Sequence, residues 1–296
     1  MKILNFGSLC FNRIYAVESF ARAGNLAKAK AFSVEPGGRG FCQSIAMARA
    51  GSLVYHAGKA GSDGQAIIDA LNENGVNESF VLRSANSSGH SVIQVNKYGN
   101  ACVLTNDGAN NEITTVEIDQ ILDNFSAGDF LTLQNEISNV SYIIESASRR
   151  GMVVALNPSP VNEALYRVDL NHVNYLILNE DEGYALTGEA KHNRILDKLL
   201  DSHTRMKVVL TLGRNGSFYA ETRFRLRQDA FVCLEEDSSC AGDAFFGYFI
   251  SRISMGIKPW TSLRVASEAA AISVSKHGAY TSIPLKEEVE AFTKKP

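Results

Sequence analysis

The sequence lacks several features that would fix a protein's class at once. No apolar run approaches the ~20 residues that span a bilayer, which argues against a transmembrane helix. Its five cysteines form no Cys-x-x-Cys pair, and its six histidines have no His-Glu-x-x-His or similar spacing, so no metal motif is evident. The opening residues become polar too quickly for a signal peptide. We therefore expect no membrane association.

A strong charge of one sign is also missing. The net charge of −3 argues against a nucleic-acid-binding surface, which needs clustered Lys and Arg. Unpaired, scattered cysteines are typical of reduced thiols in a cytosolic protein, so we expect a cytoplasmic location. A hydrophobic content of 45% over 296 residues is enough for a large core.

Short apolar strands alternate with helical segments along most of the chain. We expect strands at Lys2–Phe6, Leu53–Ala57, Asp129–Leu133, Met152–Leu156, Tyr175–Leu178, Val208–Leu212 and Gly216–Tyr219. We expect helices at Gln43–Ala50, Gly64–Glu73, Val140–Arg149, Ile195–Ser202, Asp243–Met255 and Ser262–Lys276. This alternation predicts an α/β fold with a mainly parallel central sheet covered by helices on both faces.

Two segments, at about residues 11–34 and 89–106, break the alternation. Ser91–Asn96 and Ala101–Leu104 read as a hairpin with its turn at Lys97–Asn100. We interpret both segments as insertions that form a small β-sheet lid on one domain spanning residues 1–296. A surface ornament is the alternative, whereas a lid would exclude water from a site below it.

The segment Asp237–Phe245 carries the strongest chemical signal. A small-residue turn, including Ala241 and Gly242, opens an apolar helix, and Asp243 lies in its first turn. The first N–H groups of a helix have no internal partner, so small residues there let an anion approach the backbone. Asp243 is a candidate general base beside that cradle, the pairing needed for phosphoryl transfer to an alcohol. A helix N-terminus capped by an aspartate is the alternative reading.

A second glycine-rich segment, Gly37-Gly38-Arg39-Gly40, leads into a helix near the N-terminus. It allows a tight turn and close backbone approach to a ligand. It is neither a Walker A loop nor a GxGxxG turn after the first strand, so it does not identify a function alone.

Together the two segments resemble the signature regions of the ribokinase-like (PfkB) carbohydrate kinases. Further matching segments, in the same order, are Gly7-Ser8, Gly108-Ala109-Asn110, Gln134-Asn135-Glu136, Asn157-Pro158-Ser159-Pro160, Asn179–Glu182, Thr211–Gly213 and Lys276–Ala279. The resemblance covers about Lys2 to Phe292. It implies a three-layer fold and an ATP-dependent transfer of the γ-phosphate to a hydroxymethyl group of a sugar.

The resemblance also implies roles for individual residues. Asp243 would remove the proton, and the amides of Cys240, Ala241 and Gly242 would hold the developing charge. Four residues would bind the nucleotide: Asn179, Thr211, Gly213 and Gly216. Glu182 would act on Mg²⁺ through water, consistent with the few protein ligands this ion takes.

Two further groups of residues follow from the resemblance. Substrate contacts would come from Asn12, Gly38, Arg39, Cys42 and Glu136. Backbone carbonyls of a monovalent cation site, for K⁺, would belong to Asp237, Ser239, Ser273, Lys276, Gly278 and Ser282. Relatives often pair through the lid, so a homodimer is a further expectation.

The chain departs from the family pattern around the substrate. Asn12 replaces an Asp that usually grips sugar hydroxyls, and Cys42 replaces a frequent Asn, so two polar contacts are weakened. Phe41 could stack on a base or belong to the core. Cys240 stands where Gly or Ala is usual, and we expect a buried thiol there. A redox role is the alternative, but it is disfavoured because no resolving cysteine is evident nearby in the sequence.

These departures leave alternatives open. The substrate could be ribose, another sugar or a related small polyol, or a nucleoside. A non-enzymatic relative that binds a sugar or nucleotide is a second class, supported by Asn12 and Cys42 but opposed by the intact Ala241-Gly242-Asp243. A dehydrogenase is disfavoured, because Gly7-Ser8-Leu9-Cys10 supplies no dinucleotide-binding turn.

Overall fold

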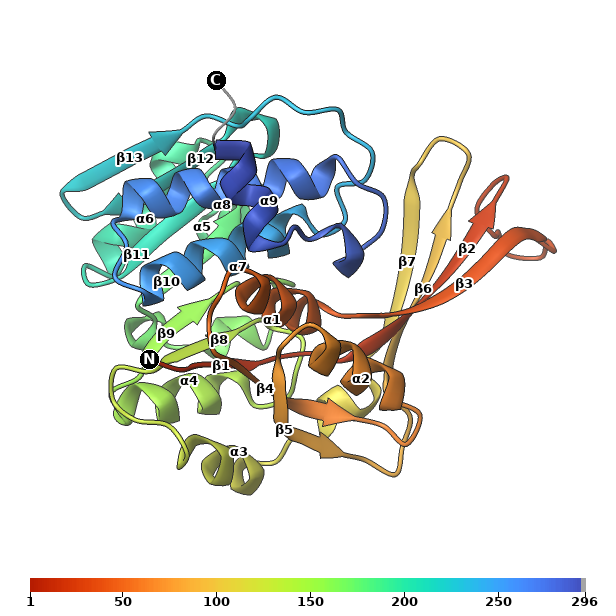
Figure 1. The fold of residues 1–296 in the computed structure, drawn as a ribbon, viewed down its shortest axis with the longest axis horizontal. Helices are drawn as coiled ribbons and strands as arrows, with labels where there is room; N and C mark the ends of the chain where they lie inside the picture. Colours follow the sequence, from red (N-terminus) through yellow and green to blue (C-terminus); the bar gives the residue numbers. More distant parts are fainter. Residues whose placement is uncertain (294–296) are drawn as a thin grey trace.

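A mainly parallel sheet runs through the body of the protein (Figure 1). The computed structural model describes residues 1–293. The strand order within the described residues is β13-β12-β11-β10-β9-β8-β1-β4-β5. All strands from β11 to β5 run parallel, and β12 and β13 are added antiparallel at one edge. The strands are β1 Ile3–Phe6, β4 Val54–Ala60, β5 Asn77–Arg83, β8 Phe130–Leu133, β9 Val153–Leu156, β10 Tyr175–Asn179, β11 Lys207–Thr211, β12 Ser217–Glu221 and β13 Phe224–Gln228.

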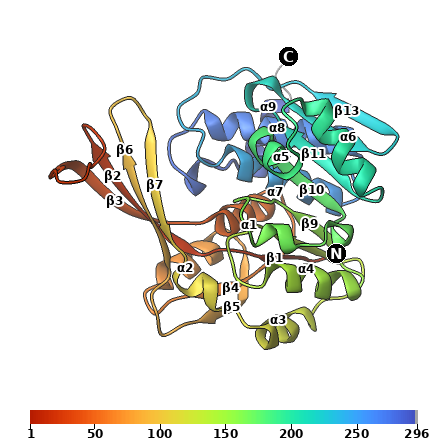
Figure 2. The same cartoon turned by 180° about the vertical axis from the view of Figure 1, so that it is seen from behind.

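Helices cover both faces of this sheet and complete three layers. On the face toward the viewer in Figure 1 lie α1 (Arg39–Arg49), α7 (Ala241–Ser254) and α8 (Pro259–Val274). The opposite face, seen in Figure 2, carries α4 (Val140–Arg149), α5 (Glu180–Thr187) and α6 (His192–Ser202). The remaining helices are α2 (Gln65–Glu73), α3 (Thr115–Leu122) and α9 (Lys286–Thr293), with short 3-10 turns at Gly108–Glu112, Leu165–Arg167, Leu170–His172, Gly213–Asn215 and Tyr280–Ser282.

The sheet residues alternate between two hydrophobic cores. Ile3, Phe130 and Ile177 pack with α1 and α7, while the next residues along the same strands, Leu4 and Leu131, pack with α3 and α4. Successive side chains of a strand point to opposite faces, so strands that are apolar throughout indicate a sheet buried on both sides. The three-layer α/β fold expected from the sequence is therefore confirmed.

Most predicted elements are present, and the differences have local causes. The helix at Val140–Arg149 has the predicted bounds. Helix α1 begins four residues before the predicted Gln43, because Gly38, at φ 105°, turns the chain directly into it. The strand predicted to end at Ala57 continues through Gly58 to Ala60. Gly58 lies against the backbone of Gly7, and a Cβ at Gly58 would be 2.5 Å from the Gly7 carbonyl oxygen, so glycine lets the strand continue here.

A second, four-stranded sheet projects from the body (Figure 1); we call it the small sheet. It is built from β2 (Cys10–Val17), β3 (Ala29–Gly37), β6 (Gly89–Val95) and β7 (Ala101–Asn106), in the order β3-β2-β6-β7. Strands β6 and β7 form the hairpin expected from the sequence. Residues of β3 and β7 are largely exposed, so this sheet has little core of its own.

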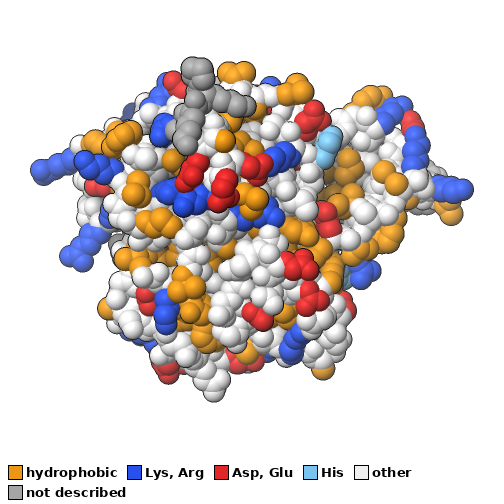
Figure 3. All heavy atoms as spheres, viewed as in Figure 1, with side chains coloured by type: hydrophobic (Ala, Val, Ile, Leu, Met, Phe, Trp, Pro, Cys, Tyr) orange, Lys and Arg blue, Asp and Glu red, His pale blue; other side chains and the backbone are white. Residues whose placement is uncertain are grey.

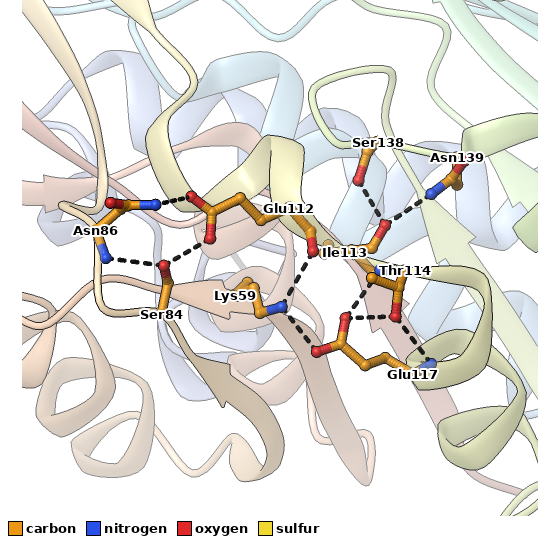
Figure 4. A network of polar contacts seen from close by, with 9 residues as sticks. All are labelled: Lys59, Ser84, Asn86, Glu112, Ile113, Thr114, Glu117, Ser138 and Asn139. Carbon is orange, nitrogen blue, oxygen red and sulfur yellow. Dashed lines mark hydrogen bonds and ion pairs between the residues drawn. The ribbon is translucent and has the colours of Figure 1, made fainter.

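A polar network holds the root of the β6–β7 hairpin to the body (Figure 4). The Glu112 carboxylate, where the chain returns from β7, accepts hydrogen bonds from Ser84 (2.6 Å) and Asn86 (2.7 Å), where it departs toward β6. Lys59 on β4 donates to the Glu112 carbonyl (3.0 Å) and pairs with Glu117 on α3 (2.7 Å). Glu117 also forms a capping box with Thr114.

Removing the Glu117 carboxylate should therefore destabilise the fold. Glu117→Ala breaks the capping box and leaves the mostly buried Lys59 ammonium without its counter-charge. We expect a loss of about 2 kcal/mol in the free energy of unfolding, measured by denaturant titration. Glu145→Ala is the matched control, since its pair with Arg149 is exposed and should cost less than about 0.5 kcal/mol. Equal losses for the two variants would contradict a structural role for this network.

No helix within residues 1–293 is both long and apolar enough to cross a membrane.

Candidate active site

The glycine turn and the first strand form one wall of the site. Gly38 begins α1 with φ 105°, and a Cβ there would lie 2.9 Å from the Ser8 carbonyl oxygen, so glycine is required. The Arg39 amide donates to the Glu136 carboxylate (3.1 Å), which also accepts a hydrogen bond from the Ser8 hydroxyl. The Arg39 guanidinium lies 3.8 Å from Glu136. Burial raises the pKa of Glu136, while Ser8 and Arg39 oppose that shift.

Helix α7 crosses α1 closely enough to bring the two signature segments together. At Gly247 a Cβ would lie 2.3 Å from the Ala46 Cβ, so only glycine permits this approach. One turn earlier on each helix, the Gln43 amide donates to Asp243 Oδ1 at 2.9 Å. The structure thus places Asp243 beside the glycine turn, 200 residues away in the sequence from Gln43.

Asp243 is buried and has a raised pKa. Only 5% of the residue is exposed, and burial raises its pKa from 3.8 to about 6. The positive charge of Arg39 and the hydrogen bond from Gln43 oppose this shift, and the charges of Glu136 and Glu182 add to it. A carboxylate with a pKa near 6 is ionised at neutral pH and accepts a proton more readily than an exposed one.

A chain of buried polar side chains holds Asp243, and the sequence analysis missed it. Gln43 accepts from Gln134 (2.6 Å), which also donates to Asn5 (3.2 Å). Asn5 donates to Ser44 (2.7 Å), whose hydroxyl lies 2.8 Å from His56 Nδ1. Burial lowers the pKa of His56 to about 4, so this ring is neutral at physiological pH. The only signal in the sequence was the presence of amide side chains in otherwise apolar segments, and Gln43 and Gln134 lie 91 residues apart.

The turn before α7 opens onto a cavity of about 460 Å³. Its lining includes Thr211, Gly213, Gly216, Ala241 and Gly242, so the structure brings five of the sequence-predicted residues together. A Cβ added at Gly242 would meet no atom within 4 Å, so this glycine faces open space. The Ala241 amide donates to the Ser238 carbonyl (3.2 Å), and Cys240 is the N-cap of the helix without a side-chain cap. The size suits a small organic ligand.

Asn179 and Glu182 lie where β10 passes into α5, beside the end of β11. They form a capping box: the Glu182 amide donates to Asn179 Oδ1 (2.9 Å), and Glu182 Oε2 accepts from the Asn179 amide (3.0 Å). Asn179 pairs in register with Thr211 of the cavity. Both residues therefore stabilise the start of α5, and the Glu182 charge also acts on Asp243.

The residues expected for a monovalent cation lie before α7, in the last turn of α8 and in the segment that follows α8. The Asp237 carboxylate accepts from the Ser239 amide (2.9 Å) and from the Gly278 amide (3.3 Å). The hydroxyls of Ser273 and Ser282 are 2.9 Å apart. The Ser273 carbonyl already accepts from the Lys276 amide (3.1 Å). The segments converge, but this carbonyl is engaged within the protein.

Two substrate-side residues have other contacts in the structure. Asn12 lies on β2 opposite Glu35. Burial raises the pKa of Glu35, and a hydrogen bond between Glu35 and Asn12 opposes this shift. Phe41 is fully buried and packs edge-on against Tyr280, with 5.2 Å between ring centroids. Phe41 is therefore core, and the idea that it stacks on a base is wrong.

The expectation that Cys240 has no neighbouring cysteine is also wrong. Its Sγ lies 3.3 Å from Cys42 Sγ, and both residues are 4% exposed. The hydrogen bond with Cys240 and burial raise the pKa of the Cys42 thiol. The sequence separation of 198 residues hid this contact, which depends on the close crossing of α1 and α7.

A buried carboxylate beside an open helix N-terminus and a ligand-sized cavity is the arrangement that phosphoryl transfer to an alcohol requires. The model of the pfkB family carbohydrate kinases matches residues 1–286. The chain belongs to this family.

Similar proteins cover nearly the whole chain. A ribokinase from Staphylococcus aureus is 29% identical, with 97% of this chain and 98% of the relative covered. A deoxyribokinase from Salmonella typhi is 28% identical, covering 99% and 98%. The solved ribokinase from Cryptococcus neoformans in complex with ADP has a TM-score of 0.86 at 25% identity, covering 98% and 99%. The protein is thus an ATP-dependent sugar kinase of ribokinase-like fold.

Proposed function

We propose that the enzyme phosphorylates the hydroxymethyl group of a pentose, with Asp243 as general base. One observation carries this proposal: Gln43 of the glycine-turn helix donates to Asp243, while the adjacent Gly242 opens onto the cavity. The acceptor alcohol and the phosphate donor would therefore meet on either side of this carboxylate. Because ATP is the donor and five free cysteines are present, we place the enzyme in the cytoplasm.

The proposed step uses groups already described. Asp243 takes the hydroxyl proton as the sugar oxygen bonds to the γ-phosphorus, and the bond from that phosphorus to the bridging oxygen of ADP breaks. The amides of Cys240, Ala241 and Gly242 stabilise the charge on the transferred group. Since the Ala241 amide is bonded to Ser238, its use in this step requires that turn to open. The small sheet would close over the sugar and exclude water.

Magnesium fits the acidic end of β10 in this proposal. Oxygen ligands suit Mg²⁺, and the buried Glu182 carboxylate is close enough to influence the pKa of Asp243. Glu182 would hold the ion through water, and Asn179 would orient Glu182 through the capping box. When bound, Mg²⁺ neutralises phosphate charge. Thr211, Gly213 and Gly216 would contact the nucleotide.

A monovalent cation is a finer part of the proposal. Asp237 and Ser239 lie in the turn before α7, and Gly278 after α8 donates to Asp237, so a K⁺ held between these segments and the end of α8 would favour one conformation of that turn. We include the carbonyl of Lys276 in this set. Turnover should then be higher in K⁺ than in Na⁺.

The substrate proposal rests on the residues around the glycine turn. Because Phe41 is core, the site offers it to no nucleobase, and this favours a free sugar over a nucleoside. Glu136, Arg39, Asn12 and the backbone at Gly38 would bind hydroxyl groups. The Cys42 thiol is a weak hydrogen-bond partner, so a missing hydroxyl beside it should cost little.

An ADP-release assay over pentoses, hexoses, 2-deoxyribose and nucleosides, with K⁺ or Na⁺, tests this function. We expect the highest kcat/KM with a pentose, ribose and 2-deoxyribose within about 10-fold of each other, and lower values with nucleosides. The product should carry phosphate on the hydroxymethyl oxygen, as detected by mass spectrometry and NMR. If the protein binds ADP but forms no ADP from ATP with any acceptor, it is instead a non-enzymatic binding protein.

We further propose that the small sheet mediates a homodimer. Its outer strands β3 and β7 expose Phe32 (56%), Val34 (50%) and Leu104 (71%) on one face of the sheet. Figure 3 shows hydrophobic side chains on the projecting sheet and along the hollow between it and the body. A second copy would cover this apolar surface.

Sedimentation analysis tests the dimer. Leu104→Glu should convert a wild-type dimer to monomer at micromolar concentration, because a charge would be buried in the interface. Leu53→Glu, at a comparably exposed leucine outside the small sheet, should leave the dimer intact. A monomeric wild-type protein would disprove this proposal.

A further inference from the structure

Three potential metal ligands meet inside the active site. Cys42 lies in the first turns of α1, and Cys240 and Asp243 lie at the start of α7. The two Sγ atoms are 3.3 Å apart, and a carboxylate oxygen of Asp243 lies within 4.8 Å of both sulfurs. All three residues are at most 5% exposed. The proposed transfer step uses neither thiol, so the close approach of the two sulfur atoms calls for a separate explanation.

The spacing suits a small tetrahedral ion. With Zn–S distances of roughly 2.3 Å, two thiolates on one tetrahedral Zn²⁺ lie roughly 3.8 Å apart. The observed 3.3 Å needs only a small widening. The Gln43 amide holds Oδ1 of Asp243, as outer hydrogen-bond partners commonly orient metal ligands.

The ligand chemistry distinguishes this ion from Mg²⁺. Thiolates select thiophilic metals such as Zn²⁺, whereas Mg²⁺ takes oxygen ligands. Two thiolates and one carboxylate carry three negative charges, and Arg39 lies close enough to Asp243 to influence its charge state. A divalent cation together with Arg39 would balance these charges.

We propose that Cys42, Cys240 and Asp243 form a binding site for Zn²⁺ or another thiophilic divalent ion. Metal binding displaces the thiol protons and leaves the fourth ligand position to water or a substrate hydroxyl. Bound metal also occupies the carboxylate that the proposed function uses as base, so it inhibits phosphoryl transfer. This inhibition rests on the proposed function, whereas binding of the ion does not.

Spectroscopy with Co²⁺ tests binding directly. The full-length protein, kept reduced with a phosphine, is titrated with Co²⁺ and then with Zn²⁺. We expect one equivalent of Co²⁺ to give a thiolate-to-metal charge-transfer band, which Zn²⁺ then abolishes. Cys42→Ser and Cys240→Ser should each weaken binding by at least about 100-fold, since loss of an outer-shell partner alone costs about 10–100-fold. Cys102→Ser, at an exposed cysteine of the small sheet, is the matched control.

Several outcomes decide the question. No charge-transfer band in the reduced wild-type protein, or unchanged affinity in a folded Cys42→Ser variant, overturns the proposal. If both serine variants unfold, Asp243→Asn serves instead: it should weaken binding but keep the band, and an unchanged affinity overturns the site. Metal binding through the thiols without loss of kinase turnover supports the site and counts against Asp243 as the base.

Discussion

Asp243→Asn is expected to lower kcat by about 10³-fold, within the range of about 10²–10⁴ typical of a lost general base. The amide has nearly the shape of the carboxylate and can still accept a hydrogen bond from Gln43, so substrate binding and the fold should persist. Single-turnover kinetics with saturating ATP measure the effect on the chemical step.

The raised pKa of Asp243 gives this variant a second signature. The wild-type kcat/KM should rise with pH until the carboxylate is ionised, with a midpoint near pH 6, and then level off. Because burial raises the pKa from 3.8 to about 6, the ionised form destabilises the fold, and Asp243→Asn should gain as much as about 3 kcal/mol at pH 7.

Lower turnover together with higher stability would separate catalysis from folding. Asp181→Asn is a suitable control, because Asp181 is an exposed acid in the first turn of α5 and should retain normal kcat. Near-normal turnover in Asp243→Asn would remove the central claim about this site.

Gly242→Ala should also give opposite changes in activity and stability. A methyl group there meets no protein atom within 4 Å, and in the proposed mechanism it would occupy the space of the transferred phosphate. We expect kcat/KM to fall about 10²-fold, comparable to losing one oxyanion-hole donor. Since alanine favours helix over glycine, the variant should be about 0.5–1 kcal/mol more stable. Kinetics and thermal unfolding of the same sample test both effects.

Gly256→Ala supplies the comparison for this glycine. It also has free space around it, but its φ is 76°, so alanine should reduce stability without affecting kcat. Unchanged activity in Gly242→Ala would show that phosphate does not approach this turn.

The sequence predicted the body of the fold well because strongly apolar strands and amphipathic helices carry local signals. It missed β5, whose residues are half-exposed at the sheet edge and lack a clear apolar run. It also missed α3, although Thr114 and Glu117 supply a capping box. Edge strands and short helices depend on neighbours that local patterns do not specify.

The candidate site was predictable only in part, for the same reason. Gly242 and Asp243 could be recognised because a helix start has its own chemistry. The partners of Asp243 could not, since Gln43 is an ordinary amide in the sequence. The contact between Cys42 and Cys240 likewise depends on how closely α1 and α7 cross at Gly247. Close packing of distant helices leaves no trace at a single position except a small residue.

The neutral His56 and the buried Asp243 oppose each other during acidification. His56, with its pKa lowered from 6.5 to about 4, makes the fold lose stability as the pH falls through that interval. Asp243, with its pKa raised from 3.8 to about 6, makes the fold gain stability over nearly the same interval. Each residue changes the free energy of unfolding by about 3 kcal/mol, and the two changes have opposite signs, so they nearly cancel. The stability of the fold should therefore change little in mild acid while both residues are present. Replacing only one of the two residues should make the stability depend steeply on pH.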